Sequence, residues 1–183
     1  MKDTLKNYGF LALVAGVIIA LDQWSKYAIR TTLAKGEIWS PWEWLTPYAR
    51  IVHWDNSGVA FGLFQGSGQI FMILAIVVAI IIIYYYPRIA GNDWILKVAM
   101  SLQLAGAVGN LIDRMMLNGR VTDFISVGDF PVFNVADASI SVGVAILLIG
   151  VWVQEQREKK STAEQQTAET LIEEPTNHSE MSG

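Results

Sequence analysis

The chain has 183 residues, of which 52% are hydrophobic and 16% charged, and its formal net charge is −4. This composition is too apolar for an ordinary soluble domain. Cysteine is absent, which excludes disulfide bonds, cysteine metal sites and a cysteine nucleophile. The acidic excess lies in residues 161–183, and the rest of the chain is close to neutral, so a nucleic-acid-binding surface is not expected.

Four hydrophobic segments follow one another along the chain, at about residues 8–29, 68–86, 94–112 and 136–153. A helix needs about 20 mainly apolar residues to cross a bilayer, and a spanning segment must satisfy its backbone polar groups internally. The sequence therefore predicts an all-α membrane fold, a bundle of four transmembrane helices. The first segment lacks a small-residue cleavage site, so we interpret it as a helix and not as a cleavable signal peptide.

Two longer connections, residues 30–67 and 113–135, are predicted to lie on the same side of the membrane. The first has an alternating pattern with a turn at residues 56–58, which predicts short strands. Its composition is typical of an amphipathic segment in the headgroup zone, because that zone favours tryptophan. The tryptophans of this connection are Trp39, Trp42, Trp44 and Trp54.

The two termini are predicted on the opposite side, where basic residues flank the first and fourth segments. Lys2 and Lys6 precede the first helix, and Arg157, Lys159 and Lys160 follow the fourth. The positive-inside rule then predicts cytoplasmic termini and an extracytoplasmic position for both long connections. Residues 155–183 are polar and are predicted to form a disordered tail.

Ionisable residues at membrane depth are costly, so each is a candidate for function. Asp22 and Lys26 stand four residues apart, a spacing that predicts an ion pair on one helix face, with a substrate contact as the alternative. Asn110, Asp113 and Arg114 share one face if the third helix continues through them. Arg114 could pair with Asp113 or bind a phosphate or a peptide carbonyl, and these alternatives stay open.

Two further aspartates lie in the second long connection and at the start of the fourth helix. Asn134 is a good N-cap residue, which would put Asp137 at the third helical position in a capping box. Helix capping is therefore the structural alternative for Asp137. Asp123 lies in a short extended segment and has no such explanation.

A pair of carboxylates near the membrane surface indicates aspartyl protease chemistry. Two such groups share one proton because both cannot ionise at close range. The ionised member takes a proton from water while the protonated member polarises the scissile carbonyl. The alternatives are a small membrane transporter and a scaffold subunit with a polar cluster at the outer membrane face. A transporter requires polar residues at mid-bilayer depth, and the second helix has none.

Five sequence blocks occur in the order typical of one family: DQWSK at 22–26, NSGVAFGLF at 56–64, GNLIDR at 109–114, VTDFI at 121–125 and FNVADASI at 133–140. Over about residues 8–153 the chain resembles the lipoprotein signal peptidases, also called signal peptidase II. The resemblance implies a protease domain over residues 1–154 in the bacterial cytoplasmic membrane, with its active site near the outer face. It implies an aspartyl endopeptidase that removes the signal peptide from diacylglyceryl-modified prolipoproteins, cutting just before the lipid-modified cysteine.

The resemblance also implies roles for single residues. The family's catalytic pair corresponds to Asp123 and Asp137. Its other recurrent polar residues would line the substrate groove: Asn56, Asn110, Arg114 and Asn134. Three more matching residues are expected to be structural: Asp22, Lys26 and Asp113. No metal and no cofactor are expected, and the cyclic peptide globomycin is expected to inhibit by occupying the groove.

The proton of the pair can be assigned to one residue from local structure. The predicted position of Asp137 near a helix N-terminus favours its anion, because the helix dipole is positive there. We therefore expect the proton of the free protein on Asp123.

Overall fold

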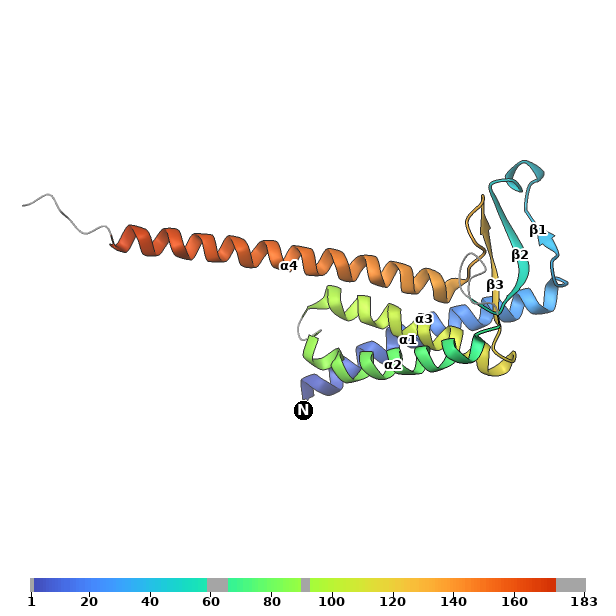
Figure 1. The fold of residues 1–183 in the computed structure, drawn as a ribbon, viewed down its shortest axis with the longest axis horizontal. Helices are drawn as coiled ribbons and strands as arrows, with labels where there is room; N and C mark the ends of the chain where they lie inside the picture. Colours follow the sequence, from blue (N-terminus) through green and yellow to red (C-terminus); the bar gives the residue numbers. More distant parts are fainter. Residues whose placement is uncertain (1, 59–65, 90–92, 174–183) are drawn as a thin grey trace, which may run out of the picture. The chain divides into compact units, whose positions relative to one another are not determined.

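The computed structural model describes residues 2–58, 66–89 and 93–173 of the chain (Figure 1). Its helices are α1 (Lys2–Thr32), α2 (Gly68–Ile89), α3 (Trp94–Met116) and α4 (Val135–Glu173), and a short 3-10 helix, η1, spans Glu43–Leu45. Its strands are β1 (Ile38–Trp39), β2 (Ala49–Asn56) and β3 (Val121–Val127). The chain divides into two compact units, Met1–Leu147 and Leu148–Gly183. The apolar core and the candidate site both lie in the first unit.

In the described residues, four helices are long and apolar enough to cross a membrane. On α2, large apolar side chains such as Ile70, Ile73 and Ile80 are exposed. An exposed apolar surface of this kind is unfavourable in water and is natural against lipid. The structure and the sequence thus agree on a bundle of four transmembrane helices with a small sheet.

The apolar core lies between α1, α2 and α3, which run side by side in Figure 1. Its fully or nearly buried side chains come from all three helices. They are Leu11, Ala15, Ile82, Tyr86, Leu96, Met100, Leu104 and Ala105. This packing fixes α1 against α3, the two helices that carry the polar residues predicted at membrane depth.

The three strands form one antiparallel sheet in the order β1-β2-β3. It lies at the end of the bundle where α1 and α3 end and α2 begins (Figure 1). Trp54 pairs with Asp123 and Asn56 with Val121, after an irregularity in β2 between Ile51 and Trp54. The sheet therefore brings the end of β2 beside the aspartate of β3.

All four helices are longer than the sequence predicts, and the extensions of α3 and α4 bear on the site and on the predicted tail. The helix α3 runs through the GNLIDR block to Met116, so Asn110, Asp113 and Arg114 do lie on one helix. The helix α4 runs to Glu173, where the sequence predicts a disordered tail from residue 155. This part is rich in glutamate, glutamine, lysine and alanine, which are strong helix formers in themselves. Residues 174–183 of the predicted tail and residues 59–64 of the second sequence block lie outside the described residues.

Candidate active site

Asp137 lies in the first turn of α4 and takes part in a reciprocal cap. Its backbone N–H donates to Asn134 Oδ1 at 2.9 Å, and its carboxylate Oδ2 accepts from the Asn134 N–H at 3.2 Å. This is the capping box that the sequence predicts. The other carboxylate oxygen, Oδ1, accepts from Asn110 Nδ2 of α3 at 2.8 Å. Capping therefore leaves one oxygen of Asp137 for a contact outside its own helix.

Asp123 lies in the middle of β3 and is only 2% exposed. Its Oδ2 accepts from Asn56 Nδ2 at 2.9 Å, and its Oδ1 accepts from Asn134 Nδ2 at 2.6 Å. Asn56 is held in turn, because its Oδ1 accepts from the Gly58 N–H at 2.9 Å. A carboxyl group so deeply buried needs such donors to offset its lost hydration.

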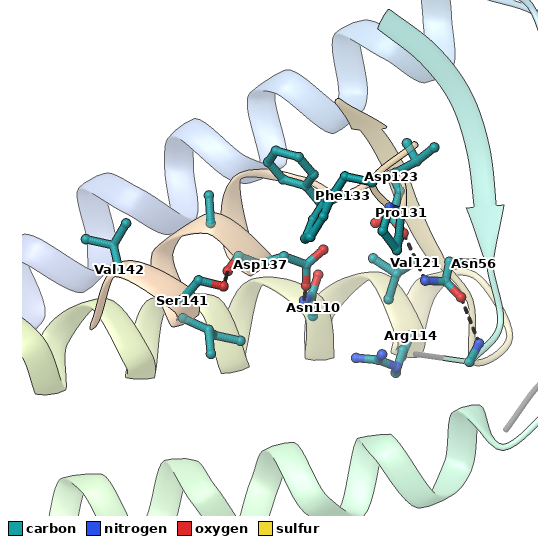
Figure 2. Close-up of a pocket in the computed structure, with 15 residues that line it drawn as sticks. Asn56, Asn110, Arg114, Val121, Asp123, Pro131, Phe133, Asp137, Ser141 and Val142 are labelled. Atoms are coloured by element: carbon teal, nitrogen blue, oxygen red, sulfur yellow. Dashed lines mark hydrogen bonds between the residues drawn. The ribbon is translucent and has the colours of Figure 1, made fainter. Parts of the chain in front are cut away.

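Two asparagines connect the two aspartates in one chain of hydrogen bonds. Asn134 Nδ2, which donates to Asp123, also donates to Asn110 Oδ1 at 3.1 Å. Asn110 then donates to Asp137. Figure 2 shows Asp137 pointing toward Asn110 and Asp123 beside Asn56. The structure thus places the two aspartates in one network built from β2, β3, α3 and α4.

The two aspartates line a cavity of about 440 Å³ (Figure 2). Asn56, Asn110 and Arg114 line it too, as the sequence predicts for a groove. Most of the remaining wall is apolar: Val121, Phe130, Pro131, Val132, Phe133, Ala138, Ile140 and Val142. A mostly apolar cavity with a few converging polar groups is the usual form of a binding site for small molecules or chains.

Asn134 differs from its predicted position in the groove wall. It is fully buried and is not among the residues that line the cavity. Its side-chain oxygen accepts from the Asp137 N–H in the helix cap, and its side-chain nitrogen donates to Asp123. The reason is local: an N-cap side chain must turn toward its own helix, which takes it away from the cavity.

Burial dominates the electrostatics of Asp123. Loss of hydration, reinforced by the nearby negative charge of Asp137, raises the pKa of Asp123 to about 7. The hydrogen bonds from Asn56 and Asn134 and the positive charge of Lys26 act in the opposite direction. Near neutral pH this carboxyl group is therefore divided between its protonated and ionised forms.

Asp22, Lys26 and Asp113 form a buried cluster behind the cavity. Lys26 Nζ lies 2.8 Å from Asp22 Oδ2 and 3.4 Å from Asp113 Oδ2. Asp113 also contacts Arg30 at 3.3 Å and accepts from the Thr122 N–H of β3 at 2.9 Å. The sequence left open whether Asp113 pairs with Arg114. In the structure the cationic partners of Asp113 are Lys26 and Arg30.

Arg114 instead lies at the cavity. It is one of the lining residues, and its guanidinium carbon is 5.5 Å from the centre of the Phe71 ring, a cation–π geometry. A guanidinium at a cavity wall can donate to a carbonyl or a phosphate.

Sequence reasoning missed two residues of the polar cluster. Gln23 Nε2 donates to Asp22 Oδ2 and to the Gly109 carbonyl, both at 3.0 Å. Arg30 bridges Asp113 and Thr122. A signal for Arg30 was present, because Asp22, Lys26 and Arg30 recur every four residues and so share one face of α1.

Among the residues that the structure describes, no group of three or more histidine, cysteine, aspartate or glutamate side chains could hold a metal ion. The chemistry open to these residues is acid–base work by two carboxyl groups beside a cavity.

Comparison with known proteins gives a consistent result. The family described as Signal peptidase (SPase) II matches residues 14–153. A protein named lipoprotein signal peptidase from Shouchella clausii is 38% identical over 151 residues, covering 82% of this chain and 97% of the relative. One of the same name from Staphylococcus aureus is 36% identical over 147 residues, covering 78% and 88%.

Solved structures agree with the sequence comparison. One, described as a bacterial membrane enzyme determined by the in meso method at 2.3 Å resolution, superposes with a TM-score of 0.75 at 34% identity. It covers 81% of this chain and 91% of that chain. A second structure of the same description, at 1.9 Å resolution, gives a TM-score of 0.70 at 35% identity.

Proposed function

The chain belongs to the signal peptidase II family, and from this premise we propose that Asp123 and Asp137 are its catalytic pair. The protein is a membrane protease that removes signal peptides from prolipoproteins. The observation that carries our assignment is the single hydrogen-bond network that joins two aspartates at the wall of one cavity. A transporter or a scaffold subunit is not favoured by family membership.

The pair can hydrolyse a peptide bond without a covalent intermediate. Ionised Asp137 takes a proton from water, and the water oxygen attacks the scissile carbonyl carbon. Protonated Asp123 gives its proton to the carbonyl oxygen, forming a tetrahedral diol. When the carbon–nitrogen bond breaks, one diol hydroxyl returns its proton to Asp123, and Asp137 gives the proton it took from water to the leaving amine.

We assign the proton of the resting pair to Asp123. Support comes from its pKa of about 7, which leaves much of it protonated at neutral pH. Asp137 accepts from Asn110 and from the Asn134 N–H at the N-terminus of α4, and both hydrogen bonds stabilise its ionised form.

The remaining cavity residues are proposed to hold the substrate. Arg114 and Asn56 lie on the cavity wall beside Asp123 and Asp137. Their side-chain N–H groups can donate to backbone carbonyls of an extended peptide. The apolar wall suits the small and apolar side chains of a signal peptide. We propose that globomycin occupies the same cavity as a competitive inhibitor.

We further propose the orientation in the bacterial cytoplasmic membrane, with the termini cytoplasmic and the active site near the outer face. The exposed aromatic residues Trp39, Trp42 and Trp44 support it, because they lie at the sheet end of the bundle. Trp42 and Trp44 are stacked at 5.9 Å between ring centres. Such a surface suits lipid headgroups. A diacylglyceryl-anchored substrate would then reach Asp123 and Asp137 by lateral diffusion.

The test is cleavage of a diacylglyceryl-modified prolipoprotein peptide by purified protein, with the cut mapped by mass spectrometry. Wild type is expected to cut before the lipid-modified cysteine. Asp123→Asn and Asp137→Asn keep the side-chain shape and remove the titratable group, so each should lose about 100- to 10,000-fold in rate.

Asp129→Asn serves as the matched control, since Asp129 is an exposed aspartate outside the cavity. It should cut like wild type. Retention of activity by a folded Asp123→Asn or Asp137→Asn variant would show that the aspartate in question only caps or packs.

A further inference from the structure

Lys26 is a fully buried cation whose contacts go beyond an ion pair. Its Nζ lies 2.8 Å from Asp22 and 3.4 Å from Asp113. It also donates to Asn110 Oδ1 at 3.0 Å. A lysine ammonium has three donors and no acceptor, so each of its protons has a partner. The third partner belongs to the hydrogen-bond network of the cavity.

This contact determines which way the Asn110 amide faces. Because Lys26 can only donate, the carbonyl oxygen of Asn110 must face it, and the amide nitrogen is left to face Asp137 Oδ1 at 2.8 Å. The reversed amide would set its N–H groups against the ammonium and leave Asp137 without this donor. Asn134 Nδ2 donates to the same Asn110 oxygen and supports the same orientation.

Asp22, the partner of Lys26, also contacts α4, the helix that carries Asp137. Asp22 Oδ1 accepts from the Ala136 N–H of α4 at 2.9 Å, one residue before Asp137. Lys26 and Asp22 together therefore connect α1 to α3 through Asn110 and to the first turn of α4 through Ala136.

We propose that Lys26 is a positioning residue for catalysis: it orients the Asn110 amide toward Asp137 and supplies the positive charge that offsets the pair. The proposal rests on the function proposed above for Asp123 and Asp137. Lys26 lies behind the cavity and not on its wall, so it acts through Asn110 and not on substrate.

Besides orienting Asn110, the charge of Lys26 should affect the pKa of Asp123. The titratable and charged groups around Lys26 and the pair are Asp22, Arg30, Asp113, Arg114, Asp123 and Asp137. The positive charge of Lys26 lowers the pKa of Asp123, so its removal should raise that pKa further. A residue with a purely structural role would leave the pH profile of a folded variant unchanged.

The experiment compares variants in the prolipoprotein peptide assay at several pH values. Lys26→Met removes the charge at similar length but leaves Asp22 buried with less compensation. The double variant Asp22→Asn with Lys26→Met removes both charges, and the amide oxygen introduced at position 22 can still accept from the Ala136 N–H. Arg30→Gln is the matched control: it also removes a cation from Asp113, and Arg30 donates to Asp113 and Thr122, not to Asn110.

The folded double variant should lose about 10- to 100-fold in kcat with an unchanged KM. The upward move of the alkaline limb, by about one unit, is expected in Lys26→Met, which removes only the positive charge. In the double variant the loss of the negative charge of Asp22 offsets that shift. Arg30→Gln should keep both the wild-type kcat and the wild-type limb.

A folded double variant with wild-type kcat would overturn the proposal, as would a folded Lys26→Met variant with the wild-type alkaline limb. An equal loss of kcat or an equal shift of the limb in Arg30→Gln would overturn it as well. Failure of both Lys26 variants to fold would overturn it too, because Lys26 would then serve the fold alone. Activity in Asp123→Asn or Asp137→Asn, run in the same assay, would instead refute the catalytic pair.

Discussion

At the scale of single residues, the site depends on the way asparagine amides are shared between two carboxyl groups. Asn134 caps α4 with its oxygen and donates to Asp123 with its nitrogen. Asn110 accepts from Lys26 and donates to Asp137. Each amide uses both its acceptor and its donor, so neither can turn without breaking a bond on the other side. The network therefore holds Asp123 and Asp137 in fixed positions.

The pH dependence of activity follows from Asp123. Its pKa is raised to about 7 and its protonated form is the proposed acid, so activity should be high below that value and fall as the pH rises through it. The profile of kcat/KM should thus show an alkaline limb near pH 7, which belongs to the pair as a whole. A profile that stays flat from neutral pH to about pH 9 would contradict the assignment of the proton.

The sequence predicts the contacts between nearby residues of the site, but not the contacts between distant ones. The capping box of Asn134 and Asp137 spans three residues and was predicted from the sequence, as was the Asp22–Lys26 pair. The contact of Asn56 with Asp123 joins residues 67 apart and depends on the register of β2 with β3. No periodicity encodes that register, so the pairing of Asp123 with Asp137 came only from the family resemblance.

At the scale of elements, the position of Asp137 depends on a close approach of α3 and α4. A Cβ atom built on Gly106 would lie 2.4 Å from the Ala136 carbonyl oxygen and 2.5 Å from Ile140 Cγ1. Small residues at such contacts let two helix backbones approach closely in lipid. The glycines of α3 thus bring the first turn of α4, and with it Asp137, within reach of Asn110.

Gly106→Ala should therefore lower both stability and activity. The added methyl group must push α4 away, at a cost of about 1–3 kcal/mol in unfolding free energy, and the shift displaces Asp137. Thermal unfolding in detergent and the cleavage rate measure the two effects. Gly16→Ala on α1 is the control, because nothing lies within 4 Å of its added Cβ. Equal stability of the two variants would contradict the close approach.

The lengths of the elements show a second limit of sequence reasoning. Hydropathy predicted where apolar segments end, near residues 112 and 153, but α3 ends at Met116 and α4 at Glu173. A helix can continue through polar residues when these find partners, as Asp113 does with Lys26 and Arg30. Beyond residue 153 the chain has strong helix formers and ion pairs such as Lys159 with Glu155 at 2.6 Å.

At the scale of the whole molecule, the residues proposed for function belong to the first compact unit. The proposed catalytic and substrate-binding residues all lie within Met1–Leu147. Truncation after Lys160 should leave the cleavage rate within about twofold of wild type, because polar terminal segments usually tolerate removal. Truncation after Leu147 removes part of a candidate membrane span and should abolish activity. A folded chain that ends at Lys160 and has lost activity would show that the tail contributes to the reaction.

The most direct test of the central claim is the cleavage rate of Asp123→Asn, Asp137→Asn and the double variant, each checked for folding. Residues that act as one unit are non-additive. We predict that each single variant loses as much rate as the double variant. A double variant whose loss in rate is the product of the two single losses would contradict a shared catalytic pair. A folded single variant that cuts at a near wild-type rate would contradict it too.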